Sequence, residues 1–568
     1  MSAYQPHTRD MFTLLTQVLN GPRQIGALPA FAEVDQDLME QVLDEAGKFV
    51  GEVIAPINRD GDEIGCRFEQ GRVITPPGFR DAYQAFWQAG WPALAAAPED
   101  GGQGLPSVLE AMLYEMLSGA NHGWTMAPGL LHGAYECIKH HASDELKAQY
   151  LGKVATGEWL ATMCLTEPHA GSDLGLARTR ATPLPDGRFA LNGTKIFISG
   201  GEHDLSENIV HLVLARLPDA PPGPKGLSLF LVPKFYADGT RSAVHCERIE
   251  EKMGLHGSAT CVMRFDDAAS WIVGEPGKGL NAMFVMMNAA RLHVAMQGIG
   301  LLDSAWQKAD AYARERRQMR APGRKASPAE ADFIIEHPAV RRMLDTQRAW
   351  VDGGRVLAYR TGLELDRIRH GNAEQAAAAQ RWCSLVTPVL KAAWTHQAFH
   401  GGSECLQVFG GHGYVREWGI EQILRDARVA MIYEGTNEIQ AIDLLARKIV
   451  PDGGASLNAL LDEIAADLDV AGRARLERLR RCTTTLVAAA GQQAALPFQV
   501  ADDYLRAFTL VLLDWAWQRI DAQLPADTPE RATRWQAPLQ ALRTWVLPEG
   551  EMRVGIIDSL VQGPTAAA

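Results

Sequence analysis

The chain has 568 residues and a mass of 62.0 kDa, more than one hydrophobic core usually supports, which indicates roughly three or four structural units. Hydrophobic residues make up 47% and charged residues 22%, and no apolar run reaches the roughly 18 residues that a membrane span needs. The formal net charge of -13 disfavours nonspecific binding to nucleic acid or to anionic membranes.

The first residues and the cysteines indicate the compartment. The start, MSAYQPHTRDMFTLLTQVLN, has neither the basic-then-apolar pattern of a secretory signal nor the Arg- and Ser-rich composition of a transit peptide. The 8 cysteines include no CxxC pair and no Cys/His ligand spacing, so we predict neither a disulfide framework nor a metal site. We therefore expect a cytoplasmic protein.

Helical patterns dominate the chain, and one region of short strands interrupts them. From residue 35, DQDLMEQVLDEAGKFVGEVIAPIN has helical apolar spacing ended by Pro56, and helix-like stretches continue to about residue 160. Between about 161 and 275, runs such as KIFIS, NIVHLVLARL and GLSLFLVP alternate with turns, which predicts a small antiparallel sheet domain. A long helical pattern then runs from Leu280 to about Met319, and further helices follow to about residue 448.

The last part of the chain predicts an appended helical region. After PDGGAS, amphipathic stretches lie near 457–485, 498–523 and 529–546. The predicted fold class is therefore α+β, mostly α. The predicted divisions are an N-terminal extension, an N-terminal helical domain, a middle β-domain, a C-terminal helical domain and an additional helical domain, at residues 1–34, 35–160, 161–277, 278–448 and 449–568.

Short motifs carry little information one at a time. CLTEPHAGSDL, from residue 164, joins a β-type run to a turn-forming segment, and KIFISGG offers Phe197 as a flat apolar face beside Ser199. VFGGHGY supplies three glycines, and MIYEGTNEIQ places Glu434 between an aromatic residue and a Gly-Thr pair. GKGLNA, at 277–282, matches a dinucleotide fingerprint only weakly, because helix and not a strand follows it. Alone, each motif is typical of a loop, a cap or a surface position.

Together, the identities, order and spacing of these motifs resemble the acyl-CoA dehydrogenase family. CLTEPHAGSDL is similar to the first signature of that family, and QVFGGHGYVREWGIEQILRDARVAMIYEGTNEIQ is similar to the second. The resemblance covers residues 35 to 448 and implies a helical, small-sheet, helical domain order whose C-terminal domain is like a four-helix bundle. YQPHTRDMFTLL, EKMGLHGSATCVMRF and the region after 450 resemble the large subgroup with a C-terminal helical extension, which includes 3-methylthiopropanoyl-CoA dehydrogenase.

The resemblance implies a reaction and a base for it. An acyl-CoA would lose hydrogens from C2 and C3 and become a trans-2-enoyl-CoA, with FAD accepting the C3 hydride. Glu434 would abstract the C2 proton, while the Gly435 N–H and a flavin ribityl hydroxyl would bind the thioester carbonyl. The implied substrates are 3-methylthiopropanoyl-CoA or a fatty acyl-CoA.

The resemblance also implies residues for FAD and substrate. FAD contacts within one subunit carry over to Leu165, Thr166, Phe197, Ser199 and Thr436. Contacts to the FAD of a neighbouring subunit carry over to Arg316, Gln318, Gln407, Gly410 and Gly411. Substrate contacts carry over to Ser172 and Arg291. The sequence departs from the family at Met319, where many relatives have Phe, and at Glu438, where the subgroup often has Gly.

Partners and alternative functions follow from the same resemblance. Electrons would leave through an electron-transfer flavoprotein, and the shared flavin site implies a homo-oligomer, with a dimer favoured. An acyl-CoA oxidase that uses oxygen, a DNA-associated non-dehydrogenase on the same fold and a catalytically silent scaffold are the alternatives. The region 449–568 contains GRARLERLRR, but its 11 arginines and no lysines stand against 15 acidic residues, and the net charge of about -4 argues against nucleic acid.

Overall fold

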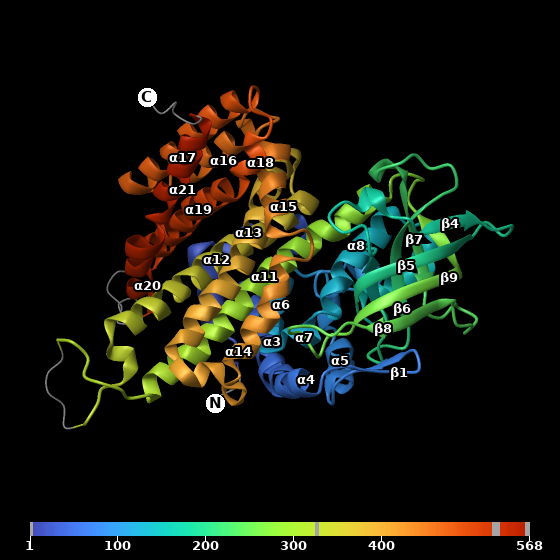
Figure 1. Ribbon diagram of the computed structural model, residues 1–568, viewed down its shortest axis with the longest axis horizontal. Coiled ribbons are helices and arrows are strands. Elements are labelled where there is room, and N and C mark those ends of the chain that lie inside the picture. The colour runs from blue at the N-terminus through green and yellow to red at the C-terminus, as the bar shows by residue number, and fades with distance from the viewer. Residues whose placement is uncertain (1–3, 324–328, 525–533, 563–568) are drawn as a thin grey trace. The chain divides into compact units, whose positions relative to one another are not determined.

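The computed structural model describes residues 4–323, 329–524 and 534–562, without the side chains of 285 and 287–290 (Figure 1). It contains two compact units, each assembled from segments that are separate in the chain. The helical unit comprises Met1–Lys48, Pro106–Gly119 and Val294–Ala568, and the sheet unit comprises Phe49–Leu105 and Ala120–His293. These two units interleave segments that the predicted domains keep apart, so they do not test the predicted boundaries, which remain a prediction.

The helical unit is built from long helices and a set of shorter C-terminal ones. In chain order its helices are α1 (Thr8–Thr13), α2 (Gly21–Gly26), α3 (Gln36–Phe49), α6 (Ser107–Ala120), the later part of α11 (Gly279–Glu315), α12 (Pro338–His370), α13 (Ala373–Val408), α14 (Ile420–Arg428), α15 (Asn437–Ile442), α16 (Ala455–Ala465), α17 (Val470–Ala490), α18 (Leu496–Gln499), α19 (Ala501–Gln523), α20 (Gln536–Ala541) and α21 (Glu549–Val561). In the part of the chain that the structure describes, no helix is both long and apolar enough to cross a bilayer.

Helices α12 and α13 form the centre of this unit. They pack closely because Gly354 has no side chain: a Cβ there would lie 2.0 Å from the Trp394 indole nitrogen. That indole N–H donates to the Trp350 carbonyl on the facing helix at 2.9 Å. Helix α13 begins with a capping box, in which the side chains of Asn372 and Gln375 each bond the other residue's backbone N–H. The close approach at Gly354 and the Trp394–Trp350 hydrogen bond therefore fix how the two helices pack, in addition to apolar burial.

The C-terminal helices α16 to α21 confirm the predicted appended region, although residues 529–533 of one predicted stretch lie outside the described residues. Helix α19 packs against α12, where the Trp517 indole N–H donates to the Ala349 carbonyl at 2.8 Å. Three of the five arginines of GRARLERLRR on α17 pair with acids of neighbouring helices. These pairs are Arg475 with Asp514, Arg478 with Asp558 and Arg480 with Asp462.

The sheet unit combines a seven-stranded sheet with short helices. Its strands are β3 (Leu160–Cys164), β4 (Arg180–Pro183), β5 (Phe189–Ser199), β6 (Ile209–Arg216), β7 (Leu227–Pro233), β8 (Val244–Ile249) and β9 (Thr260–Val273), with a separate hairpin of β1 (Arg67–Glu69) and β2 (Arg72–Ile74). Its helices are α4 (Asn58–Ile64), α5 (Phe79–Gln88), α7 (His122–Thr125), α8 (Leu131–His141), α9 (Asp144–Leu146), α10 (Gly152–Ala155) and the first part of α11.

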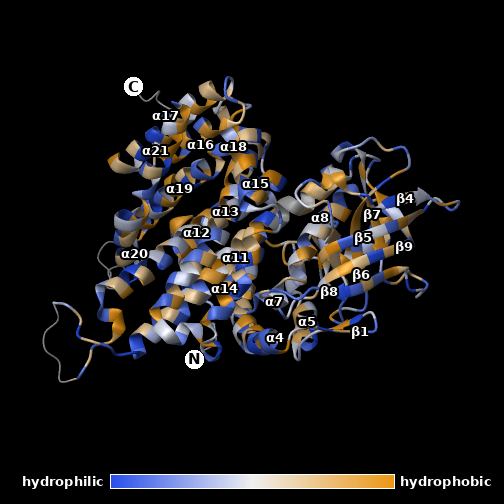
Figure 2. Ribbon diagram, viewed as in Figure 1, coloured by the Kyte–Doolittle hydropathy of each residue, from blue (hydrophilic) through white to orange (hydrophobic). Residues whose placement is uncertain are grey.

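The sheet is mixed, which corrects the prediction of an antiparallel one. The order β3-β6-β4-β5-β9-β7 closes on itself through pairing of β6 with β7, and β8 pairs with β9. Strand β3 runs parallel to β6, and the long connection through β4 and β5 provides the crossover that parallel pairing requires. Strands β6 and β7 are apolar along most of their length (Figure 2) and are buried on both faces. The centre of the sheet therefore forms the core of this unit.

The helix predicted to end at Pro56 does not end there. After α3, the backbone continues as a π segment at Val50–Ile54 and a 3-10 turn at Ala55–Ile57, and α4 then follows. Pro56 occupies the first turn of that 3-10 segment, a position where its missing N–H breaks no helical hydrogen bond.

A fully buried ionic cluster joins three helices of the helical unit. Arg355 on α12 donates to Glu115 on α6 at 2.7 Å and to Asp303 on α11 at 2.9 Å, and Tyr359 donates to Glu115 at 2.7 Å. Burial opposes ionisation of Asp303, but Arg355 and other neighbours outweigh it and hold the pKa of Asp303 well below its usual range. Removing one member would leave buried charges uncompensated.

We expect Arg355→Met to destabilise the protein by about 3–5 kcal/mol, because it would leave buried Glu115 without its arginine and Asp303 with only Arg348 of its two arginines. Arg314→Met is the matched control: its ion pair with Asp310 has an arginine side chain 63% exposed, and such pairs contribute about 0–1 kcal/mol. Chemical denaturation followed by tryptophan fluorescence measures both. Equal midpoints for the two variants would contradict a stabilising role for the buried cluster.

Candidate functional site

In the sheet unit, the end of strand β5 presents an aromatic ring to solvent. The β5–β9 register shifts between Lys195 and Ile198, and Phe197, in that irregular segment, has a φ of +61°. A left-handed conformation costs a residue with a side chain about 1–3 kcal/mol, so it persists only where its surroundings impose it. The ring of Phe197 is 60% exposed, and Ser199 follows at the end of the strand. The bulge thus provides a flat apolar face beside a hydroxyl.

A buried ion pair fastens the loop after β3 to this strand. Lys195 Nζ donates to Glu167 at 2.8 Å and to the Leu165 carbonyl at 3.0 Å, and the Ile196 N–H donates to the Thr166 carbonyl at 2.9 Å. These bonds bring the predicted residues Leu165 and Thr166 together with Phe197 and Ser199. Neither member of the pair was predicted, although a lysine within the apolar run KIFIS was a usable signal.

The electrostatics of the loop favour an ionised Glu167. Its carboxylate also accepts hydrogen bonds from the Thr179 hydroxyl at 2.6 Å and from the Arg178 N–H at 2.7 Å. Burial alone would raise the pKa of Glu167, but Lys195 and these hydrogen bonds outweigh burial and lower the pKa to about 2. Above the pKa of Glu167, its ion pair with Lys195 therefore holds the loop in place.

The two predicted substrate residues also fall in the sheet unit. Ser172 is exposed in the loop after β3. Arg291 lies on α11 and is buried, with 9% of its surface exposed. Nothing in the structure tests their predicted contacts, which remain a prediction.

In the helical unit, Glu434 lies in a turn of left-handed backbone. Glu434 has a φ of +55° and Gly435 a φ of +82°, between a 3-10 segment at Val429–Met431 and helix α15. Both residues are half-buried, and Thr436 caps α15 by accepting the Ile439 N–H. Two consecutive left-handed residues, one of them a glutamate, form a strained turn that its neighbours must hold.

Buried polar side chains donate hydrogen bonds to the backbone carbonyls of this turn. Lys391 Nζ, on α13, donates to the Gly435 carbonyl at 2.7 Å and to Asn437 Oδ1 at 2.9 Å. Gln440 Nε2, on α15, donates to the Glu434 carbonyl at 3.0 Å. Among the described residues, none accepts a hydrogen bond from the Gly435 N–H. The turn therefore places an available backbone donor next to a half-buried carboxylate.

The residues predicted to reach a neighbouring subunit's cofactor surround one aromatic cluster of the helical unit. Tyr312 on α11 stacks on Phe409 with ring centres 4.3 Å apart and bonds His412 through its hydroxyl at 2.9 Å. Arg316 and Gln318 follow Tyr312 in the chain, and Gln407, Gly410 and Gly411 flank Phe409. The stacking of Tyr312 on Phe409 therefore holds the two groups of residues close together. The predicted residues, all exposed, are Arg316, Gln318, Gln407, Gly410 and Gly411.

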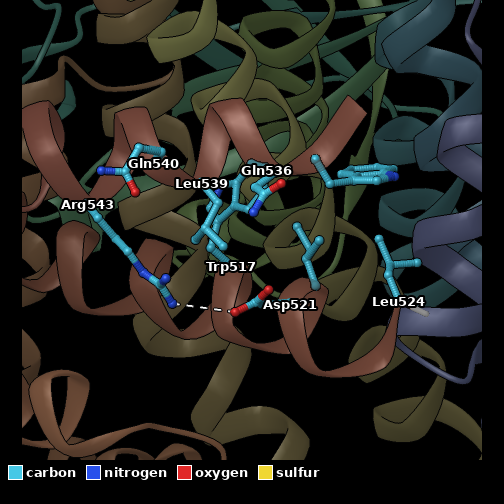
Figure 3. Close-up of a pocket in the computed structure, with 9 residues that line it drawn as sticks. Trp517, Asp521, Leu524, Gln536, Leu539, Gln540 and Arg543 are labelled. Carbon is cyan, nitrogen blue, oxygen red and sulfur yellow. Dashed lines mark hydrogen bonds and ion pairs between the residues drawn. The ribbon is translucent and has the colours of Figure 1, made fainter. Parts of the chain in front are cut away.

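A cavity of about 220 Å³ lies between α19 and α20, far along the chain from these residues (Figure 3). Trp517, Leu539 and Arg543 are among the residues that line it, and Arg543 pairs with Asp521 at 3.5 Å. None of the residues predicted for catalysis, cofactor or substrate lines it. We assign it no part in the reaction.

Comparison with known proteins identifies the class. Three family models match the chain: the acyl-CoA dehydrogenase N-terminal domain at residues 36–158, the middle domain at 162–268 and the C-terminal domain at 277–449. The chain is 45% identical to the 3-methylmercaptopropionyl-CoA dehydrogenase of Ruegeria pomeroyi, over 82% of this chain and 79% of that protein. It is 36% identical to the broad-specificity linear acyl-CoA dehydrogenase FadE5 of Mycobacterium tuberculosis, over 84% of this chain and 81% of the relative.

Solved structures agree with this fold. The acyl-CoA dehydrogenase of Bacillus anthracis, complexed with FAD, superposes with a TM-score of 0.74 at 21% identity, covering 95% of this chain and 91% of that one. Caenorhabditis elegans ACDH-11, in complex with C11-CoA, also gives 0.74 at 19% identity, covering 100% and 97%. The chain belongs to the acyl-CoA dehydrogenase family, and it is a flavin-dependent oxidoreductase of that class.

Glu167 makes stability depend on pH in a defined direction. Its folded pKa of about 2 lies below the unfolded value of about 4.3, so its contribution is present above pH 4.3 and is lost as the pH falls toward 2. We expect Glu167→Gln to lower stability at pH 7 and to flatten the acid limb of the stability curve, whereas exposed Glu207→Gln should change neither. Thermal unfolding between pH 7 and pH 3 measures this, and parallel curves for Glu167→Gln and the unaltered protein would contradict it.

Proposed function

We propose that the Glu434–Gly435 turn is the catalytic centre for α,β-dehydrogenation of an acyl-CoA to a trans-2-enoyl-CoA. Glu434 takes the C2 proton, and the Gly435 N–H donates a hydrogen bond to the thioester carbonyl. The observation that supports this most strongly is the half-buried carboxylate beside a backbone N–H with no acceptor among the described residues.

These two groups suit the chemistry of a thioester. The C2 proton is a very weak acid, so a carboxylate removes it only if the negative charge that develops on the carbonyl oxygen is stabilised. A fixed backbone donor provides that stabilisation because it needs no reorganisation as the charge forms. Base and donor on adjacent residues can act on the same substrate group at the same time.

The described residues also fit the family's cofactor. When bound, FAD supplies the acceptor for the C3 hydride. The exposed ring of Phe197 fits a face-to-face contact with a flat heteroaromatic group, and Ser199 offers a hydroxyl beside it. Residues proposed to hold FAD are Leu165, Thr166, Phe197, Ser199 and Thr436, with Arg316, Gln318, Gln407, Gly410 and Gly411 contacting the FAD of a second subunit. Ser172 and Arg291 are the proposed substrate contacts.

The proposed substrate is 3-methylthiopropanoyl-CoA or a linear fatty acyl-CoA. The first is supported by the relative at 45% identity, whose name gives that substrate, and the second by the broad-specificity relative at 36%. We also propose a cytoplasmic homodimer that passes electrons to an electron-transfer flavoprotein. The exposure of all five residues proposed to reach a second subunit supports the dimer.

The domain boundaries at residues 35–160, 161–277, 278–448 and 449–568 remain a proposal. The ranges of the three family models support the first three of these segments.

Of the alternatives, an oxidase shares the same base and differs in its use of oxygen, so comparing oxygen with an electron-transfer flavoprotein as acceptor separates the two. The pairing of Arg475, Arg478 and Arg480 on α17 with acids argues against a DNA-associated function.

Glu434→Gln tests the base. We expect bleaching of the flavin by a good acyl-CoA substrate to slow by roughly 10²- to 10⁴-fold, with acyl-CoA affinity nearly unchanged, because the amide cannot accept the C2 proton. Stopped-flow absorbance under anaerobic conditions measures it. Glu477→Gln, on α17 with a side chain 50% exposed, is the control and should match the unaltered protein. An unchanged rate in Glu434→Gln would remove Glu434 as the base.

A panel of acyl-CoA thioesters tests the substrate. We expect anaerobic titration with straight chains of three to sixteen carbons, together with 3-methylthiopropanoyl-CoA, to bleach the visible flavin band with one class of chain. Fastest bleaching by the thioether substrate would support the first assignment, and fastest bleaching by longer straight chains would support the second. A bound flavin that no member bleaches would contradict the proposed reaction.

A further inference from the structure

Gln440 is a buried amide directly beneath the Glu434–Gly435 turn. It has no exposed surface, and its Nε2 lies 3.0 Å from the Glu434 carbonyl oxygen and 3.5 Å from the Gly435 carbonyl oxygen. A Cβ on Gly435 would lie 2.7 Å from the same Nε2, so the amide packs directly against the turn backbone. The side chain is therefore placed to control the conformation of the turn.

The orientation of the Gln440 amide follows from its neighbours. Both nearby backbone atoms are carbonyl oxygens, so the NH₂ group and not the oxygen must face them. The other end, Oε1, is buried and accepts no hydrogen bond from any described residue. A buried unsatisfied acceptor destabilises a protein by about 1–3 kcal/mol, and an apolar side chain of similar length would avoid that loss. The side chain retains an amide in spite of this, which points to a function for its donor end.

Peptide geometry transmits the contact to the Gly435 N–H. The Glu434 carbonyl and the Gly435 N–H belong to one planar peptide, which is trans, so they point in opposite directions. Holding the carbonyl toward Gln440 therefore directs the N–H away from the buried amide. If this peptide rotated about its axis, the carbonyl would replace the N–H as the group facing outward.

The next peptide has a second and shorter contact besides the 3.5 Å contact to Gln440. The ammonium of Lys391 holds the Gly435 carbonyl at 2.7 Å, and Lys391 is itself positioned by Asn437 at 2.9 Å. Asn437 in turn donates to the Ala392 carbonyl and accepts from the Thr395 hydroxyl on α13. With the Gly435 carbonyl fixed in this way, the Gln440 contact is the hydrogen bond that sets the direction of the preceding peptide.

We propose that Gln440 is a positioning residue for the reaction: its amide orients the Glu434–Gly435 peptide so that the Gly435 N–H faces the thioester carbonyl. This rests on the proposed function, in which that N–H stabilises the charge on the carbonyl. Gln440 touches neither substrate nor cofactor in this scheme and acts only through the backbone.

The test uses the FAD-loaded protein and 3-thiahexanoyl-CoA labelled with ¹³C at the thioester carbonyl. Sulfur at position 3 leaves no C3 hydrogen, so the compound reports proton removal and carbonyl polarisation without hydride transfer. Two quantities are measured: exchange of the C2 hydrogens with deuterated solvent, and the infrared stretching frequency of the labelled carbonyl. A hydrogen bond from the Gly435 N–H lowers that frequency.

In Gln440→Met, which removes the donor and keeps the length, we expect exchange to slow roughly 10- to 100-fold and the carbonyl frequency to rise toward its value in solution. Gln440→Asn, whose shorter amide does not reach the Glu434 carbonyl, should behave similarly. Gln397→Met is the matched control: it also replaces a buried glutamine of the helical unit, one that bonds Gln347, and should leave exchange and frequency unchanged. Glu434→Gln should abolish exchange but keep the lowered frequency.

The outcomes separate the two proposals. An unaltered protein that binds the analogue without C2 exchange or a lowered carbonyl frequency would overturn the proposed function, and this inference with it. An unaltered protein that shows both, beside a Gln440→Met variant that matches it, would overturn the role of Gln440 alone. Failure of both Gln440 variants to fold, while Gln397→Met folds, would also overturn it, because the side chain would then serve folding rather than the direction of one N–H.

Discussion

The Glu434–Gly435 turn, the proposed catalytic centre, has a backbone conformation that needs support from neighbouring side chains. Glu434 and Gly435 both have positive φ, and a glutamate adopts that conformation only when other contacts outweigh the strain. Those contacts come from the buried donors of Lys391 and Gln440, which hold the two successive carbonyls of the turn. The buried donors therefore stabilise the strained turn, and no described residue accepts a hydrogen bond from the Gly435 N–H.

A buried lysine that donates to a backbone carbonyl also occurs in the sheet unit. There, buried Lys195 donates to the Leu165 carbonyl and pairs with Glu167, next to a second strained residue, Phe197. In both units a buried ammonium group fixes a backbone carbonyl close to a residue held in left-handed backbone. Such buried polar groups stabilise only if they are well satisfied, so they specify one local conformation more sharply than apolar packing does.

Much of the fold was predictable from periodicity, and the contacts that organise the site were not. The helical spacing after Leu280 predicted α11, and the short apolar runs predicted the strands, because burial leaves these patterns in the sequence itself. The parallel pairing of β3 with β6 and the continuation past Pro56 were missed, since each depends on what the segment meets in space. Glu434 was predicted from its motif. Lys391, 43 residues earlier, was not, because no local pattern links the two positions.

In the proposed reaction, Glu434 and the Gly435 N–H act on one thioester. A crystal structure of the FAD-loaded protein with a bound 3-thia-acyl-CoA, which has no C3 hydrogen to transfer, tests this most directly. The predicted result is a thioester carbonyl oxygen about 2.7–3.1 Å from the Gly435 nitrogen, with C2 about 3–3.5 Å from a carboxylate oxygen of Glu434. A carbonyl bound elsewhere, or a Glu434 carboxylate that faces away from C2, would contradict it.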